Sequence, residues 1–491
     1  MSTLLSVKQL VQSLTRAEKR SFKLFAGHLE GEKDYMKLYD ILTDSQVTVE
    51  SAKERYRYIC PESNINATCN YLYHILIKSL RTLNQQNFAE EQLLTGIHET
   101  RILFRKGLVE EGFGLLDKLG KIAMKNEKVA YLVILSKMEL DYLTRFQFKG
   151  LTENELIKIQ SRLRKSLSYE LNLADHSALY ELLYHRYLLN GEVRSQKDKE
   201  KLNDLVVTEM NLAGNTRFQS FDLKKDHLLF QSVYFMMTGD SKSSLGTFYE
   251  LNGLFEENKQ LWNDTPIYYI NHLRGILNNL HASRQFKEMD FFIQKLKLLE
   301  IDNELLILRQ IIYCSELKMA IGIKNYTSAF EMIKKNTDLL EGLDQLTPTD
   351  RAETVLFTSV GLFLQKKYKQ AATILGKVIH MEHVQNDQLR RELRLVNLVV
   401  HFQLQDQHYL SSEIRSLERE LKRSRKFVQT EFALLKMMKK YPTAMNRNAK
   451  NKLFEGLLDQ LHILVENPFE RHLFGVFDFV EWVNSLLVTE K

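Results

Sequence analysis

The stretch TPTDRAETVLFTSVGLFLQKKYKQAATILGKVI, residues 347–379, predicts a hairpin of two helices. Thr347 suits the N-cap position, where its hydroxyl accepts a hydrogen bond from a free N–H group of the first turn. Pro348 suits the next position, because the N–H group that proline lacks has no partner there anyway. Asp350 would face the positive end of the helix dipole. Apolar and small residues follow at helical spacing as far as Phe363, so we expect one buried face.

A second helix is predicted after a short polar break. Residues 365–367, Gln-Lys-Lys, interrupt the apolar stripe, which resumes at Tyr368 and continues through Ala371 and Leu375. Two helices joined by so short a connection lie antiparallel. We expect the small side chain of Ala371 to let the helices approach closely, with Tyr368 and Leu375 filling the seam between them.

The second-helix pattern recurs along the chain. An aromatic residue, a small or apolar residue three positions later and a large apolar residue seven positions later occur again from Phe286 and from Tyr326, and in degraded form from Tyr409. With Tyr368 included, the aromatic positions are separated by 40, 42 and 41 residues. Such a two-helix repeat is typical of an α-solenoid, in which each hairpin buries its apolar face only against its neighbours. The predicted repeat-packing residues are Phe286, Tyr326, Ala329, Tyr368, Ala371 and Leu375.

Tyr368, Ala371 and Leu375 resemble the second helix of a tetratricopeptide repeat, and the copy at Tyr326 is similar. The resemblance covers residues 96–430 and is to the broad tetratricopeptide-like class, because the period exceeds the usual 34 residues and the glycine expected in the first helix is missing. Three segments, LTRAEKRSFKLFA, YLYHILIKSLRTL and FDFVEWVNSLL, make the whole chain resemble bacterial helical-repeat proteins. These resemblances imply an all-α fold, and they do not suggest any particular activity.

Composition favours the same fold class. The 491 residues include only 5 prolines and 20 glycines, so few positions interrupt long helices. The three cysteines, Cys60, Cys69 and Cys314, are too few for a disulfide framework and suit a reducing compartment. No run approaches the roughly 20 apolar residues of a membrane span, and the N-terminal residues lack the apolar core of a signal peptide. We therefore expect a cytoplasmic protein without membrane contact.

Three domains are predicted along the chain. Residues 1–90 form a helical bundle, residues 91–430 form the tetratricopeptide-like repeats, and residues 431–491 form a C-terminal helical cap. The N-terminal bundle is interpreted as a cap that covers the first repeat, since the ends of a solenoid need covering. The alternative is a helix-turn-helix module, because its last helix is basic and includes Lys78 and Arg81.

Two details are predicted near the middle of the chain. Thr152 and Glu155 have the spacing of a capping box and should open a helix over residues 153–170, and Asp175 should cap a separate helix after it. Residues 190–202, NGEVRSQKDKEKL, are the most polar stretch of the chain. They are predicted to form a surface loop that runs into a helix, where the stack of repeats is interrupted or mobile.

Signatures of catalysis were sought and not found. The chain has no glycine-rich phosphate loop, no G-x-S-x-G, HExxH or EF-hand motif, and no paired CxxC. His380, Glu382 and His383 could offer metal ligands, but near-consecutive groups at a helix end are more often solvated. Cys60 and Cys69 have no second pair. We therefore predict no enzyme, no cofactor and no metal site.

The constellation with most functional weight is basic. Residues 415–452 hold 12 basic residues against 3 glutamates, a net charge of +9 that exceeds the +6 of the whole chain. Spacings of 4, 3 and 4 put Arg415, Arg419, Lys422 and Lys426 on one helical face. The candidate partner-binding residues are Arg415, Arg419, Lys422, Arg423, Lys426, Lys439 and Lys440.

Three interpretations of this basic stripe stay open. It is a solvated face balanced by acidic neighbours, a site for an acidic protein or peptide, or a nucleic-acid site. The predicted function is a non-catalytic scaffold or adaptor that binds a protein or peptide ligand, because stacked hairpins make a long concave surface. The alternative is a regulator that binds nucleic acid through the N-terminal module or the stripe. A third and weaker interpretation is an enzyme whose active site is formed by residues far apart in the sequence.

Overall fold

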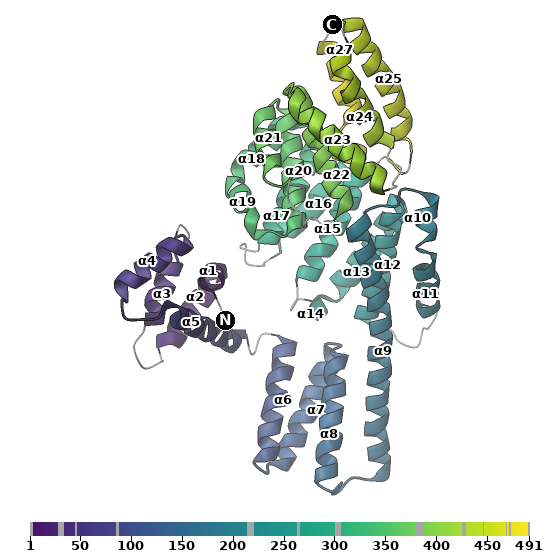
Figure 1. The fold of residues 1–491 in the computed structure, drawn as a ribbon. Coiled ribbons are helices and arrows are strands. Elements are labelled where there is room, and N and C mark those ends of the chain that lie inside the picture. The colour runs from purple at the N-terminus through teal and green to yellow at the C-terminus, as the bar shows by residue number, and fades with distance from the viewer. Residues whose placement is uncertain are drawn as a thin grey trace. The chain divides into compact units, whose positions relative to one another are not determined.

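The chain is all-helical in the computed structural model (Figure 1). The structure describes residues 3–27, 34–44, 47–84, 88–213, 220–262, 266–299, 306–379, 386–424, 429–444, 446–467, 469–470 and 473–489. Within those ranges no strand occurs, and no helix is long and apolar enough to cross a membrane. The all-α prediction is confirmed. The chain divides into two compact units, Met1–Glu170 and Leu171–Lys491, which are described separately.

Five helices open the first unit, and their starts follow capping rules. The hydroxyl of Thr15 accepts from the N–H of Glu18 at 3.1 Å, and a Glu18 carboxylate oxygen accepts from the N–H of Thr15 at 2.8 Å. This reciprocal pair is the predicted capping box. The bounds are α1 Leu4–Ser13, α2 Arg16–Gly27, α3 Asp34–Leu42, α4 Val49–Ile59 and α5 Ile65–Asn84.

These five helices share one apolar core. Helix α5 packs against each of the other four. Phe22, Tyr39, Tyr56 and Leu72 come from four different helices and are almost completely buried in that core. The segment therefore has the compact core expected of a bundle, and its proposed role as a cap or as a DNA-binding module stays a prediction.

The rest of the first unit is a row of long helices that run side by side (Figure 1). Their bounds are α6 Ala89–Arg105, α7 Val109–Lys125, α8 Val129–Arg145 and the first part of α9 Glu153–Asn190. The predicted capping box at Thr152 and Glu155 is present, because Thr152 N–H donates to the Glu155 carboxylate at 2.8 Å. The helix predicted over residues 153–170 and the separate helix predicted after Asp175 are, however, one continuous helix, α9. Residues 153–190 contain no glycine or proline to end a helix, and Asp175 lies exposed within it.

The second unit consists of helices that pack in consecutive pairs. The pairs are α12 with α13, α15 with α16, α17 with α18, α20 with α21, α22 with α23, and α24 with α25. First helices also pack on one another, α15 on α17, α17 on α20, and α20 on α22. The bounds are α10 Gln196–Glu200, α11 Asn203–Ala213, α12 Phe221–Met237, α13 Ser241–Glu257, α14 Lys259–Trp262, α15 Ile267–Ala282, α16 Phe286–Lys297, α17 Leu306–Gly322, α18 Tyr326–Lys335, α19 Thr337–Glu341, α20 Pro348–Leu364, α21 Tyr368–Gly376, α22 Asp387–Gln403, α23 Gln407–Ser424, α24 Gln429–Lys440, α25 Arg447–Val465, α26 Leu473–Val476 and α27 Phe479–Thr489.

The hairpin at residues 347–379 forms as the spacing predicts. Thr347 caps α20, its hydroxyl accepting from the N–H of Asp350 at 3.2 Å, and Pro348 follows in the first turn. The chain reverses at Lys366, whose φ of 58° lies in the left-handed region. Ala371 has no exposed surface, and its helix α21 packs against both α20 and α22.

Phe286 opens α16 and packs closely on the first helix α17, and Phe248 within α13 packs in a similar way on the first helix α15. A Cβ on Gly322 would lie 2.3 Å from ring atoms of Phe286, so only glycine allows this approach. Gly275 meets the ring of Phe248 in the same way, at 2.5 Å. Three of the predicted repeat-packing residues are buried, namely Ala329, Ala371 and Leu375. The three aromatic ones are half-buried, namely Phe286, Tyr326 and Tyr368.

One turn geometry recurs in the second unit. Arg284, Lys324, Lys366 and Gln405 each have a positive φ of 56–61° and each lies between the two helices of a pair. Left-handed geometry at a non-glycine residue is uncommon, so its return at nearly constant spacing reflects one repeated hairpin connection. The division into residues 1–90, 91–430 and 431–491 stays a prediction.

Candidate functional site

The predicted basic stripe lies on an exposed face of α23. Arg415, Arg419 and Lys422 are all exposed, and none of the three pairs with a carboxylate within the described part of the chain. Lys439 and Lys440 are exposed on α24, and Lys439 lies 3.2 Å from Glu418. The side chain of Arg423 and the whole of Lys426 lie outside the described residues.

Two acidic side chains of α23, Glu413 and Glu420, point toward α22. Glu413 lies 2.6 Å from Nε of Arg394 on α22, and Glu420 pairs with the same arginine. Arg390 of α22 also reaches Glu420, at 3.3 Å. Two of the three carboxylates of α23 are therefore used against α22, and the third, Glu418, pairs with Lys439 of α24. This leaves its arginines and lysine as a cationic outer face.

A second charged group lies where three first helices meet, and we call it the charged cluster. It comprises Arg274 and Asn278 on α15, Lys318 on α17, and Asp350 and Glu353 on α20. Nη1 of Arg274 lies 2.7 Å from Oδ1 of Asp350, and Nη2 of the same arginine pairs with Glu353. Nζ of Lys318 lies 2.5 Å from Oε1 of Glu353 and donates to Oδ1 of Asn278 at 2.9 Å.

The two cations keep Glu353 ionised. Burial alone would raise the pKa of Glu353, but attraction from Lys318 and Arg274 outweighs burial and holds that pKa well below its usual range. Burial alone would lower the pKa of Arg274, but the carboxylates of Glu353 and Asp350 outweigh burial and raise that pKa above its usual value. The charges therefore stabilise one another in a site that bulk water barely reaches.

Three tyrosines on α9, the tyrosine ladder, lie beside this cluster. Tyr180 and Tyr184 stack with ring centroids 5.7 Å apart, and Tyr184 and Tyr187 stack at 6.3 Å. Tyr184 keeps 39% of its surface exposed, yet burial raises its pKa, with the charges of Arg274 and Asp350 also acting on its hydroxyl.

The polar stretch predicted as a surface loop is partly buried instead. Residues 191–194, the inserted segment, lie against α22 and α24, which follow almost 200 residues later. The N–H of Glu192 donates to Oε1 of Gln388 at 2.9 Å, and the N–H of Val193 donates to the carbonyl of Met237 at 2.8 Å. Arg194 is buried, with Nη1 3.8 Å from Oε1 of Glu431. Residues 191–195 form a non-helical connection that runs into α10, as predicted, but Gly191 and Arg194 within it are buried rather than at the surface.

The inserted segment ends in a buried cluster of charges. Arg194 and Arg391 provide two guanidinium groups, and Glu392 and Glu431 provide two carboxylates. Burial raises the pKa of Glu392 to about 7, an effect that Gln388 and the two arginines oppose. Burial also raises the pKa of Glu431. Polar atoms of Arg194, Arg391 and Glu431 lack a hydrogen-bond partner within the described ranges.

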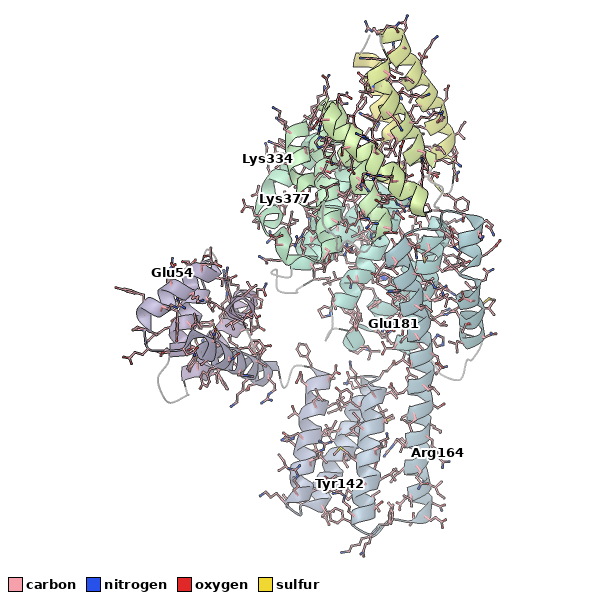
Figure 2. The ribbon with its side chains drawn as sticks, in the orientation of Figure 1. Glu54, Tyr142, Arg164, Glu181, Lys334 and Lys377 are labelled. Atoms are coloured by element: carbon pink, nitrogen blue, oxygen red, sulfur yellow. The ribbon has the colours of Figure 1, made fainter. Side chains whose placement is uncertain are left out.

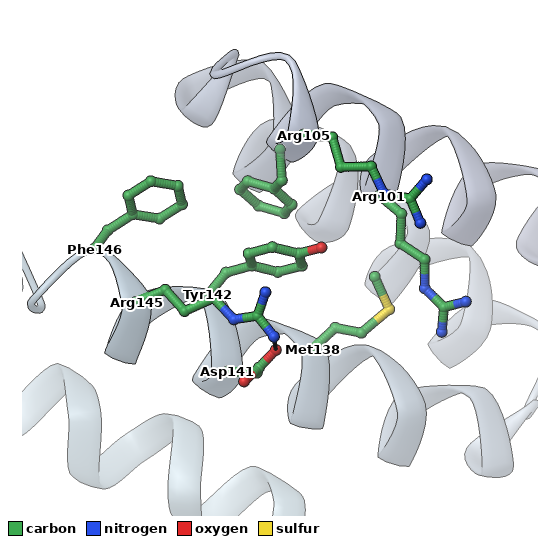
Figure 3. Close-up of a pocket in the computed structure, with 8 residues that line it drawn as sticks. Arg101, Arg105, Met138, Asp141, Tyr142, Arg145 and Phe146 are labelled. Carbon is green, nitrogen blue, oxygen red and sulfur yellow. Dashed lines mark ion pairs between the residues drawn. The ribbon is translucent and has the colours of Figure 1, made fainter.

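The first unit contains a cleft of about 580 Å³ between α6 and α8 (Figure 3). Tyr142, which Figure 2 also marks, stacks on Phe104 with centroids 3.8 Å apart, and the Arg145 guanidinium lies 5.2 Å above the tyrosine ring. Arg145 pairs with Asp141 at 2.8 Å. Both faces of Tyr142 are thus covered, so no planar ligand can stack on it. The lining residues are Arg101, Phe104, Arg105, Met138, Asp141, Tyr142, Arg145 and Phe146.

Of the residues considered as metal ligands, the structure describes only Cys60 and Cys69. Cys60 and Cys69 are buried free thiols, and the Cys60 thiol donates to Oδ1 of Asp34 at 3.3 Å. His380, Glu382 and His383 lie outside the described residues. Elsewhere, the part of the chain that the structure describes contains no group of three or more His, Cys, Asp or Glu side chains able to hold a metal ion.

Sequence reasoning missed the charged cluster and the inserted segment. Arg274 and Asp350 are 76 residues apart, and Glu192 and Gln388 are 196 apart, so no local spacing links them. One signal was available, because Lys318 lies four residues after Cys314 and seven after Ile311, on the apolar face of its helix. Comparisons of this chain with protein-family models, with curated proteins and with solved structures found no match.

Proposed function

We propose that this chain is a non-catalytic scaffold or adaptor that binds a protein or peptide, and that its second unit is a tetratricopeptide-like α-solenoid. The consecutive helix pairs, the packing of first helices on one another and the repeated left-handed turn support the solenoid. In such a fold the first helices line one continuous surface on which a ligand segment can lie. A cytoplasmic location remains part of the proposal, on the grounds of three reduced cysteines.

The observation that carries the proposal is the inserted segment. Side chains of α22 and α24 hold a non-helical stretch of chain by a hydrogen bond from its backbone and by an ion pair to its arginine. This is how a peptide is bound, with main-chain contacts giving affinity and a side-chain pocket giving selectivity. The charged cluster and the partly exposed Tyr184 offer further polar and aromatic contacts on α15, α17, α20 and α9.

The test is affinity capture from native lysate with purified wild-type protein and with a Tyr184→Ala variant. Washes at low and high salt, followed by analysis of both protein and nucleic acid, identify what is bound. We expect a defined protein partner that survives high salt and is lost or weakened at least tenfold with the variant. Tyr184 is partly exposed, so the change should cost only about 1 kcal/mol of folding stability.

Tyr249→Ala is the matched control for that experiment. Tyr249 is exposed to a similar extent, 38%, but belongs to α13, a second helix of its pair. This variant should retain the partner. If no protein partner survives high salt, or if both variants lose it equally, the scaffold proposal fails.

The alternative function, a regulator that binds nucleic acid, has one specific observation in its favour. Arg415, Arg419 and Lys422 form an exposed face without carboxylate partners among the described residues. Phosphate contacts of such groups release counterions, so binding through them weakens steeply as salt rises. Nucleic acid released by salt, with no protein partner left, would support this alternative.

Reversing two charges of the stripe distinguishes a binding surface from a solvated face. Arg419→Glu with Lys422→Glu should leave the free energy of unfolding within about 0.5 kcal/mol, because both side chains are exposed. Affinity for any anionic partner should fall at least tenfold, measured by titration at constant ionic strength. Lys242→Glu with Lys287→Glu reverses two exposed charges on other helices and is the control. Normal binding by the Arg419 and Lys422 variant would leave the stripe as a solvated face.

A further inference from the structure

The site that holds the inserted segment places buried acidic side chains beside Arg194. Helix α22 contributes Glu392 and Arg391, and α24 contributes Glu431, all three buried. Glu470, which precedes α26, also lies nearby, but its carboxylate is occupied by the first N–H groups of α24, at 2.9 Å for Gln429. Arg194 places a second guanidinium group beside these two buried acidic side chains, with Nη1 3.8 Å from Oε1 of Glu431.

The site also requires a glycine three residues earlier. Gly191 has a φ of 71°, in the left-handed region that residues with a side chain rarely adopt. A Cβ at this position would lie 2.1 Å from Oε1 of Gln388, the atom that accepts the N–H of the next residue. Glycine thus lets the backbone approach Gln388 closely enough to form that bond.

The fit of the inserted segment is incomplete. Nη1 of Arg194 lies 3.8 Å from Oε1 of Glu431, beyond hydrogen-bonding distance. Nε, Nη1 and Nη2 of Arg194, and both carboxylate oxygens of Glu431, have no hydrogen-bond partner within the described ranges. Unpaired buried polar atoms are costly, so a segment that brought its arginine within hydrogen-bonding distance would bind better than the inserted one.

We propose that residues 191–194 are an internal ligand, and that the same site on α22 and α24 accepts from a protein partner a non-helical segment in which an arginine follows a glycine by three residues. This inference rests on the proposed scaffold function and names the chemistry of its partner. The partner's N–H group after the glycine would donate to Gln388, and its arginine would pair with Glu431 beside Glu392. The inserted segment competes with it and keeps the site closed until such a partner is present.

The internal ligand has the advantage of covalent attachment. A segment tethered to its site by a short connection acts at an effective concentration in the millimolar range. A free peptide of the same sequence should therefore bind wild-type protein poorly. It should bind well once the internal segment is displaced.

The experiment titrates a fluorescently labelled synthetic peptide of residues 187–197, YLLNGEVRSQK, with full-length protein and measures anisotropy. Two variants empty the site by different means. Arg194→Ser removes the cation, and Gly191→Val hinders the close approach to Gln388 without changing any residue of α22 or α24. We expect both variants to bind the peptide at least tenfold more tightly than the wild type. Peptides with the arginine replaced by glutamate, or the glycine by valine, should not bind.

A second measurement uses the wild-type protein, so the test does not depend on how either variant folds. Hydrogen–deuterium exchange at the amides of Glu192 and Val193, which donate to Gln388 and Met237, should accelerate when unlabelled peptide is added at about 1 mM. Exchange in α20 should not change. The proposal is overturned if folded variants bind the peptide no better than the wild type. It is also overturned, whatever the variants do, if excess peptide leaves these amides protected.

Failure of this inference can be told apart from failure of the scaffold function. Loss of a captured partner with Tyr184→Ala, together with no peptide binding to either variant, keeps the scaffold and rejects the internal ligand. Peptide binding by Arg194→Ser without any captured partner shows a functional peptide site and leaves the scaffold without its ligand.

Discussion

Replacing Ala371 with glutamate is expected to lower the free energy of unfolding of the second unit by about 4 kcal/mol. Ala371 has no exposed surface and lies where α21 packs on α20. A glutamate there must either bury its carboxylate without a partner or push the two helices apart. Because neighbouring pairs pack on the same helices, the damage should spread along the unit. Denaturant unfolding followed by circular dichroism measures the loss.

Thr373→Glu is the matched control for this change. Thr373 lies two residues away on the same helix and is exposed, so the same substitution should change stability by no more than about 0.5 kcal/mol. An unfolding midpoint for Ala371→Glu equal to that of the wild type would show that α20 and α21 do not meet at this residue, and would contradict the hairpin.

Removing Glu353 should be nearly as damaging. Glu353→Ala leaves the buried Lys318 without its carboxylate and the partly exposed Arg274 with Asp350 alone, and breaking a buried pair from one side costs about 3 kcal/mol. Glu331→Ala is the control, because Glu331 pairs with Lys334 in an exposed contact on α18, and Figure 2 marks that lysine. Exposed pairs contribute about 0.5 kcal/mol. Equal losses for the two variants would contradict the charged cluster.

The effect of Glu353→Ala should also depend on pH. The pKa of Glu353 in the folded protein lies below the value of the unfolded chain, near 4.5. Its stabilising contribution is therefore fully present above pH 4.5 and declines as the pH falls below that value. The difference in stability between wild type and variant should be constant from pH 6 to 8 and shrink toward pH 3. A difference that grew on acidification would show that Glu353 is not held ionised by its neighbours.

Features that depend on a few adjacent residues were predicted well. The cap at Thr347, the capping boxes at Thr15 and Thr152, and the burial of Ala371 all follow from interactions within one turn or one hairpin. Each rests on local hydrogen bonding or on the period of the helix, which a single sequence displays directly. The exposed face at Arg415 was found for the same reason.

The errors arose where distant residues decide the outcome. Asp175 is a good helix cap by composition, yet it lies within the continuous helix α9, because nothing nearby ends the helix. The polar stretch after α9 was assigned to the surface because charged residues are usually solvated. Arg194 is buried instead, since Glu431 and Glu392 lie where the chain returns some 200 residues later.

The sequence by itself determined that this protein is helical, where many of its helices begin, and which small residues face a neighbouring helix. Those properties depend on contacts between residues close in the chain, and the spacing of these residues can be read directly from the sequence. Only the tertiary structure decided which charged residues are partners. Arg274 meets Glu353, and the inserted segment meets α22 and α24, because stacked helices bring first-helix residues of different pairs together. Charge pairing across such distances has no period in the sequence, so packing alone reveals it.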